Sequence, residues 1–241
     1  MHGCEWLVEE QKGRHFRFPN TDDGWATFIR QLDAECWVAL EVTGNAFEAH
    51  DMLSPHVGKV LLANPLELKR LGSGRHTDRV DAERLAKMLA LGMLPTVWVP
   101  PQAVRGVRRL LQYRDRLVRN RRRYLAQAKA VLRRHCLHVP RNVNPRRWLE
   151  REAVQQLPEV DRIILLSSLR QLTSVDGEIQ AIEAEIARHV VDEPGVQLLL
   201  SITGVGLVTA ATLWAYIGDP TRFRTAKQVT RYAGQIGRAH V

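Results

Sequence analysis

The chain has 241 residues, of which 35 are Lys or Arg and 26 are Asp or Glu, so that its formal net charge is +9 and its isoelectric point lies near 10.0. This length suffices for a hydrophobic core without disulfides or structural metal. A content of 45% hydrophobic and 25% charged residues excludes a collagen, a wholly disordered chain and a coiled coil from end to end. The first ten residues include three acids and no apolar run, which argues against a secretory signal, and the widely spaced Cys4, Cys36 and Cys136 indicate a reducing cytoplasm.

Strand-like and helix-like segments alternate over the first hundred residues. Strands are expected at 4–9, 15–18, 36–42 and 60–63, and helices at 21–32, 46–53 and 78–91. Asn20 or Thr21 is expected to cap the first of these helices. The run CWVALEV at 36–42 is almost continuously apolar, as is typical of a strand buried on both faces. The alternation predicts an α/β domain at 1–100.

Two long helices are predicted after Pro100 and Pro101. Apolar residues repeat every seven positions between Val104 and Leu132, which predicts one helix with a narrow apolar seam. After a break at 140–147, apolar residues recur at steps of three and four up to Ile186. We expect these helices, at 101–192, to form an antiparallel hairpin or a coiled coil with a second chain. A partial helical C-terminal domain is expected at 193–241.

An uncharged stretch at 194–218 is long enough to cross a bilayer. It contains four glycines, a proline and three threonines, which divide it into two short amphipathic pieces. We therefore expect no membrane span.

The positive charge is concentrated in one segment. Between Arg105 and Arg147 there are fifteen basic residues and one acid, so this segment carries +14 and the rest of the chain about −5. A solvated helix face normally carries both positive and negative charges. The charges of this segment would repel one another unless a polyanion is bound. Nucleic acid is the expected counter-ion, and its binding should weaken steeply with salt. The expected contact residues are Arg75, Arg105, Arg108, Arg109, Arg119, Arg121, Arg122, Arg123, Arg133 and Arg134.

Three carboxylates are candidate metal ligands. Glu41 lies within the predicted buried strand, where an ionised carboxylate needs a metal ion or a buried arginine as its partner. Asp78 and Asp81 project from one face of a predicted helix, and the simplest explanation of the pair alone is structural, as a helix cap and a first-turn acid. Together the three acids supply only oxygen ligands, which Mg²⁺ prefers. Two such ions can stabilise both the attacking and the leaving oxygen when a phosphodiester bond is exchanged.

The segment 200–211 has the pattern of a helix, a Gly-x-Gly turn and a second helix. Gly204 and Gly206 would let backbone N–H groups approach a phosphate, and the following helix start, which includes Thr209, adds a favourable dipole. This pattern is typical of a helix-hairpin-helix module that binds the DNA backbone. The alternative is a tight turn buried in a small helical domain.

Histidines raise two smaller hypotheses. His135, Cys136 and His138 have the composition of half a zinc site, but no second pair of ligands follows at a workable spacing, so packing is the better interpretation. Arg75 and His76, just before Asp78, are more simply explained as phosphate ligands.

Four segments in this order together resemble the DEDD transposases of the insertion sequence 110 family. They span nearly the whole chain, and no single one of them would be specific. They are FRFPNTDDGW at 16–25, ALEVTGNAFE at 39–48, HTDRVDAERLA at 76–86 and LLLSITGVGLVTAATLWAYIGDPTRFRTAKQVTRYAG at 198–234.

The resemblance implies an RNase H-like (RuvC-like) N-terminal nuclease domain, a connecting helical hairpin and a C-terminal transposase domain with a serine nucleophile. It implies that Glu41, Asp78 and Asp81 are the second, third and fourth acids of a catalytic tetrad that binds Mg²⁺. It further implies DNA and an element-encoded guide RNA as partners, a homo-oligomer, and a bacterial cytoplasmic, nucleoid-associated location.

Two departures from the family pattern concern the ends of the sequence. The first acid of the family follows a strand that would precede Met1, and neither Glu5 nor Glu9 matches it, so we expect that strand and that acid to be missing. The serine-bearing segment is also missing. Residues 236–241 read as the translation of a sequencing-adapter sequence, so we expect the natural sequence to end at or just before Gln235.

The expected function is therefore that of a DNA transposase fragment, which binds nucleic acid but has little or no strand-transfer activity by itself. Two alternatives remain open at this point. One is a non-catalytic nucleic-acid-binding protein in which the three acids are structural. The other is a RuvC-like structure-specific nuclease.

Overall fold

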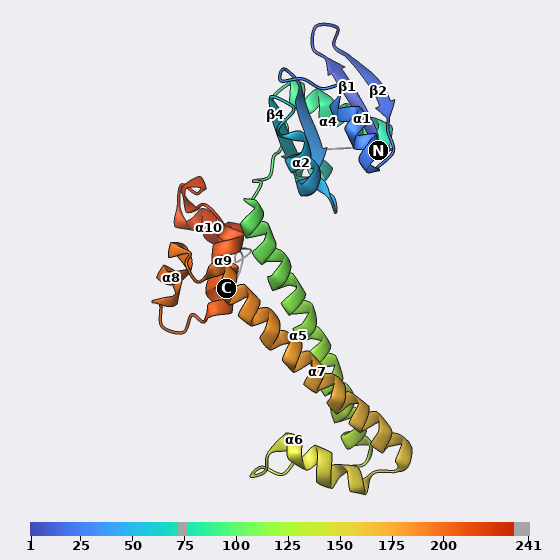
Figure 1. The fold of residues 1–241 in the computed structure, drawn as a ribbon, viewed down its shortest axis with the longest axis vertical. Coiled ribbons are helices and arrows are strands. Elements are labelled where there is room, and N and C mark those ends of the chain that lie inside the picture. Colours follow the sequence, from blue (N-terminus) through green and yellow to red (C-terminus); the bar gives the residue numbers. More distant parts are fainter. Residues whose placement is uncertain (72–76, 234–241) are drawn as a thin grey trace. The chain divides into compact units, whose positions relative to one another are not determined.

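A computed structural model describes residues 1–71 and 77–233 of the chain (Figure 1). The predicted mixture of strands and helices is confirmed. The chain divides into two compact units, Met1–Val99 and a second unit that begins at Pro100, and each is described separately here.

Unit 1 contains two separate two-stranded sheets. In the first, β1 (His2–Leu7) pairs antiparallel with β2 (Lys12–Arg17), with His2 opposite Arg17. In the second, β3 (Trp37–Glu41) pairs in parallel with β4 (Lys59–Ala63), with Trp37 opposite Lys59. Within the described residues, β1 and β3 each have one hydrogen-bonded neighbour strand. Both sheets contact the same helix, α4 (Asp78–Ala90), which packs against β1, β2 and β3.

An aromatic cluster forms the core of unit 1. Trp25 is buried on α1 (Asp22–Ile29), which begins at the predicted cap Thr21, whose side chain accepts a hydrogen bond from the Gly24 N–H at 3.2 Å. The rings of Phe18 and Phe28 stack with their centroids 4.7 Å apart. The cluster packs against α2 (Ala46–Leu53), where Leu53 is fully buried. One further helix, α3 (Pro65–Leu71), was not predicted from the sequence.

Unit 2 is built on a hairpin of two long helices, α5 (Gln102–Arg134) and α7 (Glu159–Val190), which pack along each other. Ion pairs join them, among them Arg114 to Glu183, Arg121 to Asp176 and Arg134 to Asp161, each at 2.6 Å. Because the residue number rises on one helix as it falls on the other, the helices are antiparallel (Figure 1).

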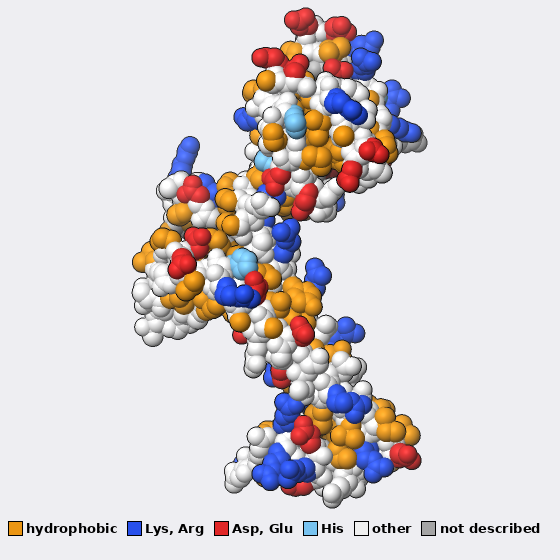
Figure 2. All heavy atoms as spheres, in the orientation of Figure 1, with side chains coloured by type: hydrophobic (Ala, Val, Ile, Leu, Met, Phe, Trp, Pro, Cys, Tyr) orange, Lys and Arg blue, Asp and Glu red, His pale blue; other side chains and the backbone are white. Residues whose placement is uncertain are grey.

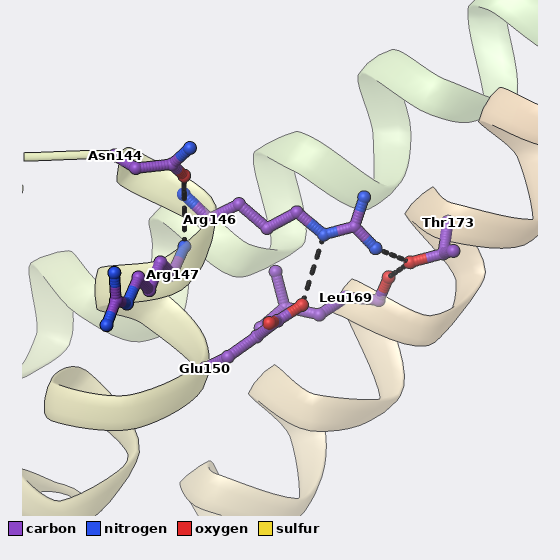
Figure 3. A network of polar contacts seen from close by, with 6 residues as sticks. All are labelled: Asn144, Arg146, Arg147, Glu150, Leu169 and Thr173. Atoms are coloured by element: carbon purple, nitrogen blue, oxygen red, sulfur yellow. Dashed lines mark hydrogen bonds and ion pairs between the residues drawn. The ribbon is translucent and has the colours of Figure 1, made fainter.

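The connection between α5 and α7 forms a small cap at one end of the hairpin. It contains α6 (Pro145–Trp148), a π-helical turn (Leu149–Ala153) and a 3₁₀ turn (Val154–Gln156), whose apolar side chains pack against both long helices. Asn144 caps α6 by accepting from the N–H groups of Arg146 and Arg147 (Figure 3). The Arg146 guanidinium donates to Glu150 and to Thr173 of α7. These bonds hold the cap to the long helix.

At the other end of the hairpin, four short helical segments complete unit 2: α8 (Pro194–Leu200), α9 (Leu207–Ile217), η3 (Pro220–Arg222) and α10 (Ala226–Tyr232). Val107 of α5, Ile186 of α7, Val196 of α8 and Ala211 of α9 are all buried in one shared core. Across residues 1–71 and 77–233 we find no helix with the length and apolar character needed to span a membrane.

Candidate nucleic-acid interface and carboxylate site

One side of α5 carries a row of arginines. The row, which we call the basic stripe, consists of Arg105, Arg109, Arg116, Arg119 and Arg123. Their spacings of four, seven, three and four residues place them on the same side of a helix. At a rise of about 1.5 Å per residue, the stripe is about 27 Å long. All except the half-buried Arg105 are exposed, so the stripe can meet a phosphate backbone in solvent.

The opposite side of α5 faces α7. Buried Val107, Ala128 and Leu132 lie there, together with Arg114 and Arg121, whose guanidinium groups are paired with acids of α7. Acids of α7 therefore neutralise cations on the inner side of α5. On the stripe, Asp115 of α5 pairs with Arg119 at 2.9 Å, and both side chains are 62% exposed. Such an exposed ion pair contributes little to the stability of the fold, so Arg119 can exchange it for a contact with a phosphate.

Besides Arg119, several of the arginines expected to bind nucleic acid have partners within unit 2. Arg121 is paired with Asp176, and Arg134 with Asp161 at 2.6 Å. Arg108 donates to the carbonyl oxygens of Ala215 and Tyr216 at the end of α9, at 2.8 and 3.3 Å. Its guanidinium also lies 5.0 Å from the centre of the Tyr216 ring, and burial lowers its pKa. These contacts hold the helices of unit 2 together.

The remaining predicted contact residues are placed as follows. Arg122 and Arg133 are exposed on α5, beside the stripe. Arg75 lies outside the described residues, and so do His76 and the proposed adapter-derived tail at 236–241. Arg116 was missed in the sequence analysis, although its position seven residues after Arg109 was a sufficient signal.

The Gly-x-Gly turn lies on the surface between α8 and α9. Gly204 has φ +89°, a conformation that favours glycine, and Gly206 is the N-cap residue of α9 without a side-chain cap. A Cβ atom at either position would meet nothing within 4 Å, so close packing does not explain the glycines. Thr209 is exposed in the first turn of α9. The alternative of a turn buried in the domain is wrong, because Gly204 and Gly206 are both exposed.

Glu41 lies at the exposed end of β3. The expectation that it is a buried carboxylate is wrong, because its side chain is exposed at the last residue of the strand. Val38 and Leu40 pack against the aromatic core, whereas Trp37, which is 58% exposed, and Glu41 belong to the opposite set of the strand's alternating side chains. No buried partner is therefore needed to compensate the charge of Glu41.

Asp78 and Asp81 lie in the first turn of α4. The interpretation of Asp78 as the helix cap is wrong, because Thr77 is the N-cap residue and its side chain accepts from the Val80 N–H at 3.3 Å. Both aspartates can still interact favourably with the helix dipole. The Asp78 charge also acts on His2: burial and Arg17 lower the pKa of this histidine, and Asp78 opposes them.

The three acids belong to elements that pack together, since α4 contacts β3. Their oxygen atoms have the chemistry that Mg²⁺ prefers. In the part of the chain that the structure describes, however, no three His, Cys, Asp or Glu side chains form a group that could hold a metal ion. The donor chemistry fits the ion, but this arrangement of the acids does not by itself make a metal centre.

His135 takes part in a polar cluster around the buried Asp161. Its Nε2 lies 2.7 Å from the Asp161 carboxylate, which also accepts from Arg134. Asp161 is 8% exposed and joins the start of α7 to the end of α5. The interpretation of His135 as a packing residue agrees with this geometry.

Replacing Asp161 by asparagine is expected to lower the thermal midpoint of unfolding at neutral pH by a few degrees. The hydrogen bond with His135, followed by the Arg134 charge, holds the pKa of Asp161 below its ordinary value. A carboxyl with a depressed folded-state pKa stabilises the fold above its unfolded pKa of about 3.9 and loses this effect as the pH falls through the folded value. The difference in thermal midpoint between wild type and Asp161→Asn should therefore become smaller at acidic pH. Asp115→Asn, at an exposed pair, is the control, and an Asp161→Asn deficit that persists at about pH 3 would contradict this account.

Comparison with known proteins places the chain among the transposases. Residues 2–137 match a family described as a transposase, the DEDD transposases of the IS110 type, and residues 196–240 match the transposase family IS116/IS110/IS902. The first match alone covers more than half of the chain. The chain belongs to the IS110 family of transposases.

Individual relatives agree with this family. A probable family 20 transposase of Pseudomonas aeruginosa is 27% identical over 88% of this chain and 64% of its own length. The transposase for insertion sequence element IS1111A of Coxiella burnetii is 27% identical over 90% of this chain and 60% of its own length. The transposase for insertion sequence element IS1328 of Yersinia enterocolitica is 25% identical over 85% of this chain. The chain thus spans about 60% of the length of the first two relatives, and the comparisons favour a transposase over the two alternatives.

Proposed function

We propose that this chain binds DNA along the basic stripe and forms part of a transposase that cuts and joins DNA strands with a divalent metal ion. The observation that carries this proposal is the row of arginines along the side of α5 that faces away from α7. An exposed cationic row about 27 Å long matches the length of about eight base pairs at 3.4 Å per pair. Family membership supports DNA as the polyanion.

In this proposal, three regions of the chain have different roles. Residues 1–100 would form the RNase H-like (RuvC-like) nuclease domain and residues 101–192 the DNA-binding helical hairpin. Residues 193–241 would begin the transposase domain, with the turn at Gly204 and Gly206 offering backbone N–H groups to a phosphate. The adjacency of β3 and α4 supports the first assignment, because these elements carry all three candidate acids.

Glu41, Asp78 and Asp81 would hold Mg²⁺, which activates the attacking oxygen and stabilises the leaving oxygen when it is bound. The chain itself positions these carboxylates at the end of β3 and in the first turn of α4, where Glu41 and Asp78 are exposed and Asp81 is half-buried. An element-encoded guide RNA would be a second polyanion for the same cationic surface, and a multimer would bring two DNA ends together. Bacterial DNA would place the protein in the cytoplasm, on the nucleoid.

The experiment is a salt titration of duplex DNA binding by the unmodified chain, followed by fluorescence anisotropy. If the five stripe arginines contact phosphates, the logarithm of the association constant should fall with the logarithm of salt concentration at a slope of about −4 or steeper. A single-stranded RNA of equal length, measured in parallel, tests the guide RNA as a partner. A DNA affinity that hardly changes with salt concentration would refute the proposal that the basic stripe contacts phosphates.

A further inference from the structure

A shallow hollow of about 440 Å³ opens on the surface of unit 2, between the first turns of α5 and the last turns of α7. Its volume falls within the range of small-ligand sites. Figure 2 shows basic, acidic and histidine side chains close together on unit 2 at this end of α7. The hollow is lined by Gly106, Arg109, Leu110 and Tyr113 of α5 and by Glu185 and His189 of α7.

The α7 side of the hollow offers hydrogen-bond acceptors. His189 Nδ1 lies 2.9 Å from the backbone carbonyl oxygen of Glu185. A carbonyl oxygen can only accept, so Nδ1 is the donor, and Nε2 of the neutral ring is an acceptor. The Glu185 carboxylate lies 3.3 Å from Nδ1 through Oε1 and pairs with Arg188 through Oε2. Each carboxylate oxygen has two lone pairs, so both oxygens can accept a further hydrogen bond from a ligand.

The α5 side of the hollow supplies an aromatic ring and a cation. Tyr113 is 44% exposed, so a flat ligand can stack on its ring. Arg109 is exposed one turn before Tyr113 and is therefore its neighbour on the helix surface. Arg109 also belongs to the basic stripe, so a nucleic-acid strand bound to the stripe would pass beside the hollow. A Cβ atom on Gly106 would meet nothing within 4 Å, so the space beside this glycine is open.

The polarity of this lining matches one nucleobase better than the others. Unpaired bases typically stack on aromatic side chains and are recognised by hydrogen bonds to their Watson–Crick edges. Guanine presents two neighbouring donors on this edge, N1–H and the N2 amino group, which match the two oxygens of the Glu185 carboxylate. Adenine, cytosine and uracil each place an acceptor next to their donor, and a carboxylate oxygen would repel that acceptor.

We propose that this hollow is a base pocket, which binds an unpaired guanine of a nucleic-acid strand lying on the basic stripe. The base stacks on Tyr113, its two donors face Glu185, and a neighbouring phosphate pairs with Arg109. The inference rests on the proposed function, because Arg109 belongs to the stripe. It gives that function a base preference, which contacts with phosphates alone do not supply. The guanine can belong to single-stranded RNA or to an unpaired stretch of DNA.

Fluorescence anisotropy of the full chain with labelled oligouridylates tests the preference. Each oligonucleotide carries guanosine, inosine or adenosine at one central position. We expect guanosine to bind about tenfold more tightly than adenosine, which cannot make the paired hydrogen bonds. Inosine lacks only the N2 amino group, so the loss should be about threefold. The same series in DNA, on an oligothymidylate, distinguishes the two sources, since the series that shows the preference identifies the strand that supplies the guanine.

Variants of the pocket separate base recognition from general attraction. Glu185→Gln should bring guanosine and adenosine within about twofold of each other, because the amide places a donor where the carboxylate accepts. Glu178→Gln is the matched control: it removes the same charge from an exposed position of α7 outside the pocket and should leave the preference intact. Tyr113→Ala should weaken binding of the guanosine oligonucleotide about tenfold, and Tyr113→Phe should restore it.

Thermal midpoints establish that every variant is folded. No detectable binding of any oligonucleotide, equal affinities for the three bases, or a guanine preference that survives Glu185→Gln would each overturn the base pocket. Equal affinities together with a steep salt dependence on duplex DNA would do so while leaving the basic stripe standing. A guanine preference without that salt dependence would instead refute the stripe and support the pocket.

Discussion

Replacing Arg109, Arg116 and Arg123 together by glutamine is expected to weaken duplex DNA binding about a hundredfold at about 0.1 M salt. Arg116 and Arg123 lie on the side of α5 opposite the residues that pair with α7. Arg109 is exposed beside the base pocket, which Glu185 and His189 of α7 also line, so the three substitutions remove phosphate contacts without opening the core. The salt slope should become shallower by about 3, because each phosphate contact contributes close to one unit. Fluorescence anisotropy across a salt series measures both quantities.

The matched control replaces arginines of the same helix on its inner side. Arg114→Gln and Arg121→Gln together remove two positive charges, against three on the stripe, and these groups pair with Glu183 and Asp176 of α7. We expect them to lower the thermal midpoint and to leave the salt slope unchanged within about 0.5. If the inner pair and the stripe change the slope equally, net charge alone attracts the DNA and the stripe is not a binding surface.

Glu41→Gln and the double variant Asp78→Asn, Asp81→Asn are each expected to weaken Mg²⁺ binding at least about tenfold. Carboxylate oxygens bind Mg²⁺ through their charge, which the amide lacks, while the shape of each side chain is preserved. Isothermal titration of the full chain with Mg²⁺, with and without duplex DNA, measures the affinity. Stable folding of the variants is expected, because all these positions lie at the surface of unit 1 or at the start of α4.

The control for the aspartate pair lies in α1. Asp22 and Asp23 are exposed acids in the first turn of a helix, the same local setting as Asp78 and Asp81. Asp22→Asn with Asp23→Asn removes the same favourable charge from a helix start, and Mg²⁺ affinity should be unchanged. Equal Mg²⁺ affinity in wild type and in all three variants would show that the acids are structural, as the sequence alone also allowed.

Local sequence signals predicted where helices and strands form better than they predicted which residues are buried. The seven-residue apolar repeat between Val104 and Leu132 indicated α5, and of the two predicted helix caps, Asn20 and Thr21, the structure has Thr21. Both signals act within a few residues along the chain. The burial of Glu41 was predicted wrongly. An apolar run does not reveal how many strands pair with it, and β3 belongs to a two-stranded sheet in which Glu41 is exposed.

The candidate site was predictable as a region and not residue by residue. The segment rich in arginine is evident from the sequence, and helical spacing alone could have grouped Arg105, Arg109 and Arg116. The partners of Arg108 and Arg121 could not be found this way. Their carbonyl and carboxylate acceptors lie 107 and 55 residues away along the chain, on α9 and α7. Only tertiary packing brings them together.

Photo-crosslinking tests the central claim, that DNA lies along the outer side of α5, most directly. A photoreactive phenylalanine analogue would replace Arg116 or Arg123 on the stripe and, in separate variants, Arg114 or Arg121 on the inner side. Bound to labelled duplex DNA at low salt, the two stripe positions are predicted to crosslink efficiently, with a yield that falls as salt rises. The two inner positions should crosslink at background level. Equal crosslinking from both sides, or from the inner side alone, would contradict the account.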